Sequence, residues 1–205
     1  IFRNNYIPAQ NLSVGESLRK WDGKRILFRI HMPRKKAKSG ILQYRFCEAD
    51  TGYCVDIEYH SASENDPHKF VEIEGTYVSD FLAPAKVVLH LLKPYLNKGY
   101  TVGIDNLYTD PRLFEVLLEN GTDAIGTVRA NKRYLPNVIK VKRLQRGYCR
   151  FWYKIITKGK KGMMCVMWQD KKTVCLMSTI HGNAIKEVDE RVKGKKKLAR
   201  NQNLM

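Results

Sequence analysis

The stretch GYTVGIDNLYTDPRLFEVLLENGTDAIGTVRANKRYLP spans residues 99–136 and carries the clearest secondary-structure pattern in the chain. Residues 100–106 and 122–129 are short runs with β-branched side chains and a turn signal on each side, which predicts two strands. Residues 109–121 lie between them with apolar side chains at helical spacing, which predicts a helix. The stretch therefore predicts a strand–helix–strand unit, with Asp105 where the first strand meets a polar turn.

The central helix of this unit has capping signals at both ends. Thr109 or Asp110 is a suitable N-cap, Pro111 takes the first helical position, and Gly121 suits the left-handed conformation that ends many helices. A second helix is predicted upstream at residues 79–99, where apolar side chains again recur at helical spacing.

Further strands are predicted on both sides of this unit. Apolar and polar residues alternate in five segments: 25–33, 41–49, 52–61, 147–157 and 162–180. The first three are expected to form an antiparallel meander, and the last two to supply three strands that extend or cap the sheet. Antiparallel strands come first and a β-α-β-α-β passage follows, which predicts a mixed α/β sheet with helices packed on it.

The length of the chain predicts one domain with a tail. With 205 residues and 43% hydrophobic content, the chain is long enough to bury one substantial core. Residues 1–185 are expected to form this domain. Residues 186–205 are basic and poor in apolar side chains, so a disordered tail is expected there, and both ends of the chain are expected to be frayed.

The charge balance predicts a polyanionic partner. Lys and Arg number 37 against 20 Asp and Glu, which gives a formal net charge of +17. A field of this size attracts nucleic acid, so DNA bound mainly through its phosphate backbone is the expected partner. A membrane surface is the competing interpretation, but no stretch approaches the roughly 20 apolar residues of a spanning helix, and no signal-peptide pattern opens the chain. No membrane partner is expected, and the oligomeric state is left open.

The cysteines predict neither a disulfide framework nor a structural metal site. They are odd in number and include no C-x-x-C pair: Cys47, Cys54, Cys149, Cys165 and Cys175. Free thiols in a reducing compartment are therefore expected.

Asp105 has two interpretations on sequence alone. A carboxylate at the end of a strand, beside an open loop, is well placed to bind a divalent cation. An Asp followed by Asn106 is also typical of a turn former or cap. A two-metal phosphoryl-transfer site requires several converging carboxylates, so Asp105 by itself does not predict one.

The segment DNLYTDPRLFEVLLENGTDAIGTVRANKRYLP resembles the catalytic-domain signature of piggyBac-type transposases, in which DNF/Y-Y/F-T-S-P precedes G-T-V-R-x-N-(K/R)-x-x-(L/I)-P. The matching positions are Asp105, Asn106, Tyr108, Thr109, Pro111, Leu113, Gly121, Thr122, Gly126, Thr127, Val128, Arg129, Asn131, Arg133 and Pro136. Residues 6–25, 32–53 and 167–179 resemble further segments of the same family in the same order. The resemblance therefore runs through most of the chain.

The resemblance implies an RNase H-like fold in which three acidic residues bind two Mg²⁺ ions and cut and join DNA ends. Asp105 matches the second acidic ligand. The first falls on Gly15, which has no side chain, while Glu16 matches the second residue of the family's D-E pair. Adjacent strand residues point to opposite faces, so Glu16 would need a local bulge or twist to replace the lost ligand. The third ligand belongs to a family segment beyond the basic tail, and the sequence ends before it.

With one of three carboxylates retained, the site is not expected to hold two cations that repel each other. We therefore expect a degenerate or domesticated piggyBac-like domain that binds DNA without cleaving it. Asp105 is then a remnant and at most a weak metal ligand, and no cofactor is expected. The alternative is an active cut-and-paste transposase seen as a partial chain, with Mg²⁺ as cofactor and another residue in place of the lost ligand.

Two basic segments are candidate DNA contacts. The first is the loop after the strand predicted at 25–33, and the second follows the strand predicted at 122–129. Their residues are Arg34, Lys35, Lys36 and Lys38 in the first, and Arg129, Lys132 and Arg133 in the second. Such cations suit phosphate contacts, although Lys-rich turns are usually only solvated. The second segment is favoured, because in the resembling family it lies close to the catalytic crevice.

Aromatic side chains interleave with these cations, which suits stacking on distorted or single-stranded DNA. They are Tyr134, Tyr148, Trp152 and Tyr153. Core packing is the competing interpretation for Trp152, Tyr153 and Trp168. A nuclear location is expected, with Lys195–Lys197 as a candidate import signal and a disordered linker as the alternative for that segment.

Overall fold

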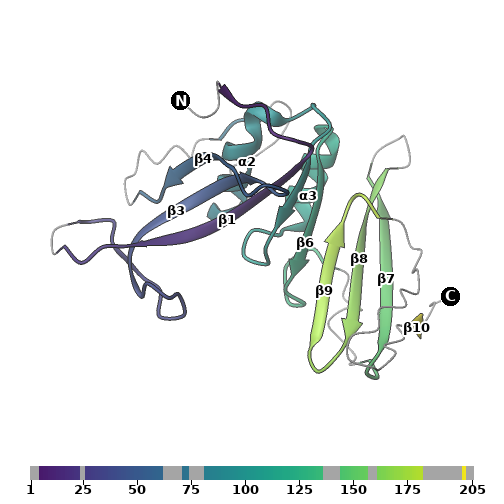
Figure 1. Cartoon of the computed structure of the whole chain (residues 1–205). Coiled ribbons are helices and arrows are strands. Elements are labelled where there is room, and N and C mark those ends of the chain that lie inside the picture. The colour runs from purple at the N-terminus through teal and green to yellow at the C-terminus, as the bar shows by residue number, and fades with distance from the viewer. Residues whose placement is uncertain are drawn as a thin grey trace. The chain divides into compact units, whose positions relative to one another are not determined.

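The computed structural model of the chain describes residues 5–23, 26–61, 71–73, 81–135, 144–156, 161–181 and 200–201. They belong to two compact units, residues 1–104 and residues 105–205. Each unit contains a set of paired strands and a helix (Figure 1).

The first unit is built around two long antiparallel strands, β1 (Asn11–Lys20) and β3 (Ser39–Glu48). The short strand β2 (Ile30–His31) and β4 (Cys54–Tyr59) also pair antiparallel with β3. β5 (Thr101–Ile104) pairs parallel with β1. The sheet of this unit is therefore mixed, and β1 joins its antiparallel part to β5.

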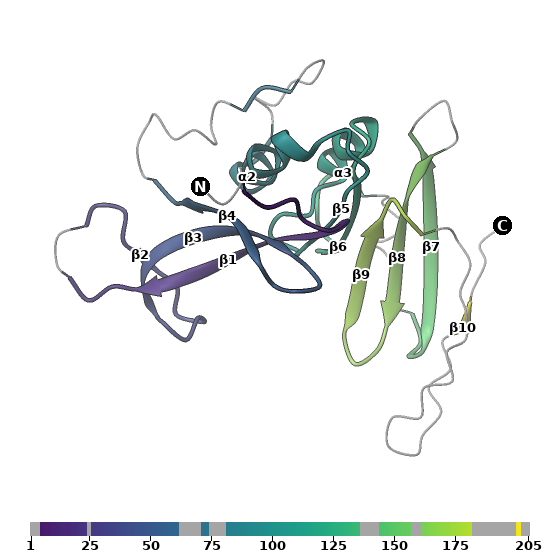
Figure 2. The same cartoon turned by 45° about the horizontal axis from the view of Figure 1, so that its top comes forward.

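Helix α2 (Ala83–Leu92) and the 3₁₀ turn η2 (Lys93–Tyr95) supply the apolar side chains that cover this sheet. Six residues of α2 are buried: Ala85, Val87, Val88, Leu89, Leu91 and Leu92. The rings of Phe46 on β3 and Tyr95 on η2 have centroids 4.9 Å apart, which packs the end of the helical segment against the sheet. Figure 2 shows α2 and the strands β1, β3 and β4 of this unit.

Glu48, the last residue of β3, fixes the segment that leads into β1. Its carboxylate is buried and accepts hydrogen bonds from the Ala9 N–H at 2.6 Å, the Thr51 hydroxyl at 2.7 Å and the Tyr6 hydroxyl at 3.0 Å. These donors, led by the Ala9 N–H, hold the pKa of Glu48 below its usual value. One carboxylate therefore connects the N-terminal segment to the turn between β3 and β4.

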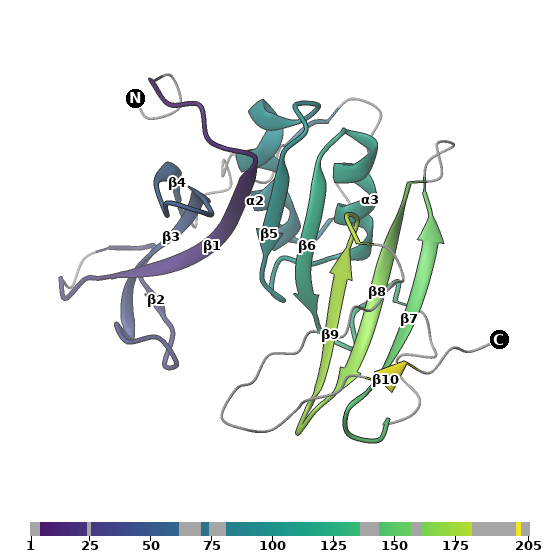
Figure 3. The same ribbon diagram turned by 45° about the vertical axis from the view of Figure 1, so that its right-hand side comes forward.

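The second unit contains an antiparallel set of four strands in the order β7 (Tyr148–Ile155), β8 (Gly162–Gln169), β9 (Thr173–Ser178) and β6 (Asp123–Val128). Figure 3 shows these strands side by side. The two-residue strand β10 (Arg200–Asn201) pairs parallel with β7. Three consecutive strands, β7 to β9, form the meander that the sequence predicts.

Helix α3 (Pro111–Glu119) begins where its sequence predicts. Asp110 is the N-cap and accepts a hydrogen bond from the Arg112 N–H at 3.0 Å. The buried face of the helix includes Leu113, Phe114, Leu117 and Leu118. On its exposed face, Glu115 accepts a hydrogen bond from the ammonium of Lys154 on β7.

The predicted mixed α/β sheet with antiparallel strands first is confirmed. The strand–helix–strand unit is present as β5, α3 and β6, and the helix predicted at 79–99 is present over its middle part as α2. In these segments the hydrophobic periodicity and the turn or capping residues predict the same secondary structure.

Two strand assignments need correction. The strand predicted at 25–33 is reduced to Ile30–His31, because the Arg29 N–H donates to the Ile26 carbonyl across a turn and Leu27 is 99% exposed. β1 is not among the five segments predicted as strands from their alternation, because its NLSVGESLRK sequence contains a glycine and several polar residues; only the family resemblance places Gly15 and Glu16 on a strand. Its pairing with β3 on one side and β5 on the other makes it a strand.

Apart from β10, the predicted disordered tail lies outside the described residues, as does the candidate import signal Lys195–Lys197. The domain extent 1–185 stays a prediction for the same reason.

Candidate functional site

Asp105 follows β5 directly and is exposed. Its Oδ1 accepts a hydrogen bond from the Leu107 N–H at 2.8 Å, and its backbone carbonyl accepts from the N–H of Thr109 at 3.0 Å and from the Thr109 hydroxyl at 2.8 Å. This is the geometry of an Asp that closes a turn through its own side chain. Of the two interpretations of Asp105, the turn former is the one that these hydrogen bonds describe.

Gly15 stands on β1 one residue after the last pair of the β1–β5 ladder, which joins Val14 to Ile104. A Cβ built on Gly15 meets no described atom within 4 Å, and the backbone of Gly15 is not left-handed. Neither packing nor backbone conformation therefore requires glycine at the position that matches the first acidic ligand.

Glu16 is engaged elsewhere in the first unit. Its Oε1 lies 3.2 Å from the ammonium of Lys35, and that ammonium also donates to the Glu16 carbonyl at 3.2 Å. The Glu16 side chain is 11% exposed. The structure therefore uses Glu16 to hold the loop between β2 and β3, and β1 pairs with β3 in continuous register at this point, without the bulge that a change of role would need.

The retained donors do not fit a two-metal site. Gly15 has no side-chain oxygen. One carboxylate oxygen of Asp105 accepts the hydrogen bond from the Leu107 N–H, and the carboxylate of Glu16 is paired with Lys35. Among the described residues there is no group of three or more His, Cys, Asp or Glu side chains that could hold a metal ion. No chemical step through a metal ion follows from this arrangement.

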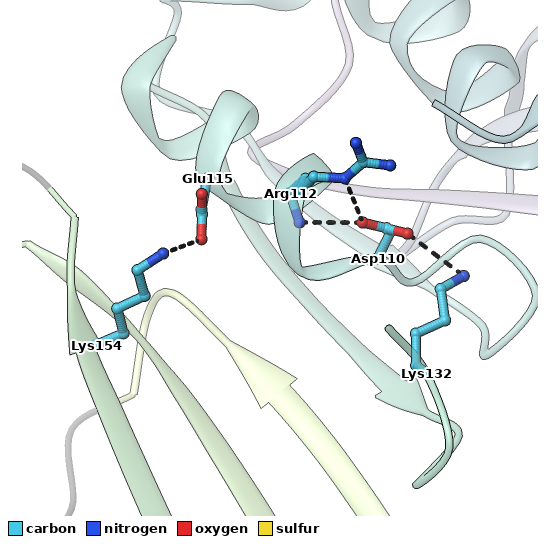
Figure 4. Close-up of polar contacts among 5 residues, drawn as sticks. All are labelled: Asp110, Arg112, Glu115, Lys132 and Lys154. Carbon is cyan, nitrogen blue, oxygen red and sulfur yellow. Dashed lines mark hydrogen bonds and ion pairs between the residues drawn. The ribbon is translucent and has the colours of Figure 1, made fainter. Parts of the chain in front are cut away.

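Asp110 organises the basic segment after β6. Its carboxylate is buried, and beside the N-cap bond its Oδ2 lies 3.6 Å from the ammonium of Lys132 while its Oδ1 lies 3.8 Å from Nε of Arg112 (Figure 4). Lys132 is therefore largely shielded and engaged with a carboxylate of its own unit. The sequence indicates Asp110 only as a helix cap, because nothing in the local pattern places Lys132 beside it.

The other cations of this segment are more accessible. Arg129 is exposed, and its Nε donates to Oδ1 of Asn106 at 3.2 Å. Arg133 is exposed, with its guanidinium carbon 5.7 Å from the centroid of the Tyr134 ring. Of the three residues predicted to contact DNA here, Arg129 and Arg133 present charge to solvent, whereas Lys132 has a structural partner.

The loop between β2 and β3 presents a second cationic surface. Met32 and Lys38 close it through a backbone hydrogen bond of 2.8 Å, and Lys35 turns inward to Glu16. Arg34, Lys36 and Lys38 are exposed, and no carboxylate of the described residues is paired with them. Three of the four predicted cations of this loop are therefore available to a partner.

The aromatic residues divide between surface and interior. Tyr134 and Tyr153 are exposed, at 55% and 49%. Tyr148, Trp152 and Trp168 are half-buried. Core packing, the competing interpretation, is therefore wrong for Tyr153.

No described helix is long and apolar enough to cross a membrane.

The arrangement is similar to a solved structure over 91% of the chain, with a TM-score of 0.71 and 27% sequence identity. That structure is the cryo-EM structure of the piggyBac transposase synaptic complex with hairpin DNA, and this chain spans 36% of the length of its protein chain. The mixed α/β architecture described above is thus the RNase H-like fold of piggyBac-type transposases.

A family model described as Transposase IS4 matches residues 1–205, the whole chain. The chain therefore belongs to this transposase family, and its resemblance to piggyBac-type transposases is confirmed.

Proposed function

We propose that this chain is a transposase-derived domain that binds DNA and does not cleave it. The observation that carries the proposal is Gly15, a residue without a side-chain oxygen, which the family resemblance matches to the first acidic ligand. Packing does not require the glycine, because a Cβ at this position meets no described atom within 4 Å. The missing carboxylate is therefore a feature of the site's chemistry and not a demand of the described fold.

Repulsion between two bound cations supports the proposed absence of cleavage. Two divalent cations at close range repel each other and need several carboxylates between and around them. Here Asp105 is the one matching carboxylate, and its Oδ1 is used by the Leu107 N–H. Loss of a catalytic metal ligand removes orders of magnitude in rate, so strand cleavage by this chain is not expected.

The charge distribution supports the binding of DNA. The formal net charge is +17, and Arg34, Lys36, Lys38, Arg129 and Arg133 are exposed. Cations of this kind contact phosphates and give affinity without reading sequence. The solved relative is a complex with DNA, which supports the same class of partner for this chain.

Salt-dependent binding of the full chain to a duplex oligonucleotide tests the first half of the proposal. Because bound phosphates release counterions, the logarithm of the affinity should fall linearly with the logarithm of salt concentration, by about 0.9 per phosphate. The variant Arg34→Ser/Lys36→Ser/Lys38→Ser should lower this slope by about 3. Lys171→Ser/Lys172→Ser, which removes two exposed lysines from the β8–β9 turn, is the control and should lower the slope by less per cation removed. A protein-interaction scaffold without a nucleic-acid role predicts affinity that does not change with salt, and that result would reject the proposal.

A nicking assay with Mg²⁺ or Mn²⁺ on transposon-end DNA tests the second half. No turnover above the protein-free reaction is expected. Turnover that disappears in Asp105→Ala would establish the rival function, an active cut-and-paste transposase.

A nuclear location is part of the proposal and rests on sequence alone. Deletion of Lys195–Lys197 from a fluorescent fusion of the full chain should reduce its nuclear accumulation. Unchanged accumulation rejects this segment as the import signal and favours its interpretation as a linker.

A further inference from the structure

Tyr134 is held in a conformation that its side chain disfavours. Its φ angle is 66°, in the left-handed region, which non-glycine residues rarely occupy and bulky ones least of all. Tyr134 as a residue is 55% exposed, while the next residue, Leu135, is buried at 5%. The turn therefore anchors itself through Leu135 and directs Tyr134 outward. Left-handed backbone at a large side chain is a form of local strain that clusters at functional sites.

The ring has a rigid cationic support. The guanidinium carbon of Arg112 lies 4.5 Å from the ring centroid, within the range of a cation–π interaction. Arg112 is the second residue of α3, and its backbone N–H and Nε both face the carboxylate of Asp110. Asp110 in turn engages Lys132, two residues before Tyr134. The same carboxylate thus contacts Arg112 at the start of the helix and Lys132 in the turn that leads to Tyr134; Figure 4 shows the contacts of Asp110 with both.

This arrangement differs from that of an aromatic residue buried for stability. Burial of the ring would remove its apolar surface from water, whereas Tyr134 leaves more than half of its surface exposed. Asn or Gly would adopt the same backbone with less strain. A preorganised, exposed ring beside two arginines is suited to contact with a flat, polyanionic ligand.

We propose that Tyr134 is a stacking platform for an unpaired nucleobase of bound DNA. The inference rests on the proposed DNA-binding function and narrows its substrate. Every base has a π-face that an exposed aromatic ring can cover, so the contact does not depend on sequence. Bases inside an intact duplex already stack on both faces, so the ligand must contain a bulge, a single-stranded segment or an extruded base. Arg133, on the same turn, and Arg129 supply cations for the flanking phosphates.

The test compares the affinity of the full chain for an intact duplex with that for the same duplex carrying a short bulge, at one salt concentration. The wild-type protein should prefer the bulged DNA by about tenfold, the order of magnitude of a base–aromatic stack. A 2-aminopurine base in the bulge should also be quenched on binding. Tyr134→Phe keeps the ring and should keep both effects.

Tyr134→Asn is the decisive variant, because Asn tolerates the left-handed backbone while removing the ring. It should lose the preference for bulged DNA and the quenching, and keep its affinity for the intact duplex. Tyr59→Asn removes a ring of equal exposure, 55%, from the end of β4 and should leave the preference unchanged. Thermal unfolding of each variant verifies that it is folded.

The outcomes separate the two proposals. If the wild-type protein has no salt-dependent affinity for either DNA, the proposed function fails and this inference fails with it. If it binds both DNAs equally, or if Tyr134→Asn weakens both complexes by the same factor, DNA binding stands and the stacking platform is rejected.

Discussion

The ammonium of Lys132 lies 3.6 Å from the carboxylate of Asp110, which also caps helix α3. Both side chains are largely shielded from solvent, with Lys132 17% and Asp110 4% exposed. A lysine that the sequence presents as one more DNA contact is thus part of the internal structure of its unit. The neighbouring Arg133 is exposed and has no such carboxylate partner among the described residues.

Asp110→Ala should therefore destabilise the second unit. The change removes an N-cap and leaves Lys132 without its carboxylate, and we expect a loss of about 2 kcal/mol in the free energy of unfolding. Asp110→Asn keeps a capping oxygen and should cost less. Urea unfolding measures both.

Lys132→Met and Arg133→Met form a matched pair for the same site. Lys132→Met should be destabilising, because it removes a cation from a buried carboxylate, whereas Arg133→Met should fall within about 0.5 kcal/mol of the wild type. The effects on DNA affinity should have the opposite order. Arg133→Met should weaken the complex with DNA more than Lys132→Met does, although it destabilises the fold less. Equal stabilities for the two variants would contradict the structural role of Lys132.

Gly15→Asp should fold like the wild-type protein. A Cβ at position 15 meets no described atom within 4 Å and the backbone is not left-handed, so the free energy of unfolding should change by less than about 1 kcal/mol. Gly40→Asp is the control: a Cβ on Gly40 would run into the backbone carbonyl of Arg19 on the paired strand. That overlap should cost about 1–3 kcal/mol or more. Circular dichroism and urea unfolding would contradict this prediction if Gly15→Asp were the less stable of the two.

Stability at acid pH should depend on Glu48. Its pKa in the folded protein is below the ordinary value of 4.5, first because of the Ala9 N–H and then because of the Thr51 hydroxyl. The stabilisation is therefore fully present above pH 4.5 and is lost as the pH falls through the lower folded-state pKa. When the free energy of unfolding in urea is measured at a series of acid pH values, Glu48→Gln should lose less stability on acidification than the wild type. Glu119→Gln, at an exposed position, should behave like the wild type. The same loss of stability in wild type and Glu48→Gln would contradict the prediction.

The same contact acts in the opposite direction on Tyr6. Donation of its hydroxyl to Glu48 raises the pKa of Tyr6 above 10.0, so this stabilisation is present below pH 10 and is lost as the pH rises through the folded-state pKa. Tyr6→Phe should remove this loss of stability at alkaline pH, as measured by the free energy of unfolding at a series of pH values.

Cys47 should react slowly with alkylating reagents. Its pKa is raised from 9.0 to about 11, first by burial and then by the thiol of Cys54, which faces it on the paired strand. The thiolate fraction at neutral pH is therefore about a hundredfold lower. Cys54→Ser should lower the pKa of Cys47 and speed its alkylation, as followed by peptide mass spectrometry. Cys165, whose pKa burial raises to about 12, should react more slowly still and serves as the internal reference. A faster reaction at Cys165 than at Cys47 would contradict the assignment.

The strand–helix–strand unit around Asp105 could be predicted because its signals are local. Asp110 caps the helix, Pro111 begins it, and Gly121 adopts the left-handed conformation expected after its end, with φ 59°. β1 could not be predicted in this way. Its residues have weak strand propensity, and pairing with β3 and β5, which lie far away along the chain, imposes the conformation.

The sequence by itself determined the charge of +17 and the absence of a carboxylate at position 15, because no fold can give glycine a side-chain oxygen. It also determined which cations are candidates for DNA. Only the tertiary structure decided which of them are free: Lys35 pairs with Glu16 and Lys132 with Asp110, while Arg34, Lys36, Lys38 and Arg133 stay exposed. The reason is that ion pairing depends on distance in space, and packing alone brings residues 16 and 35, or 110 and 132, within reach of each other.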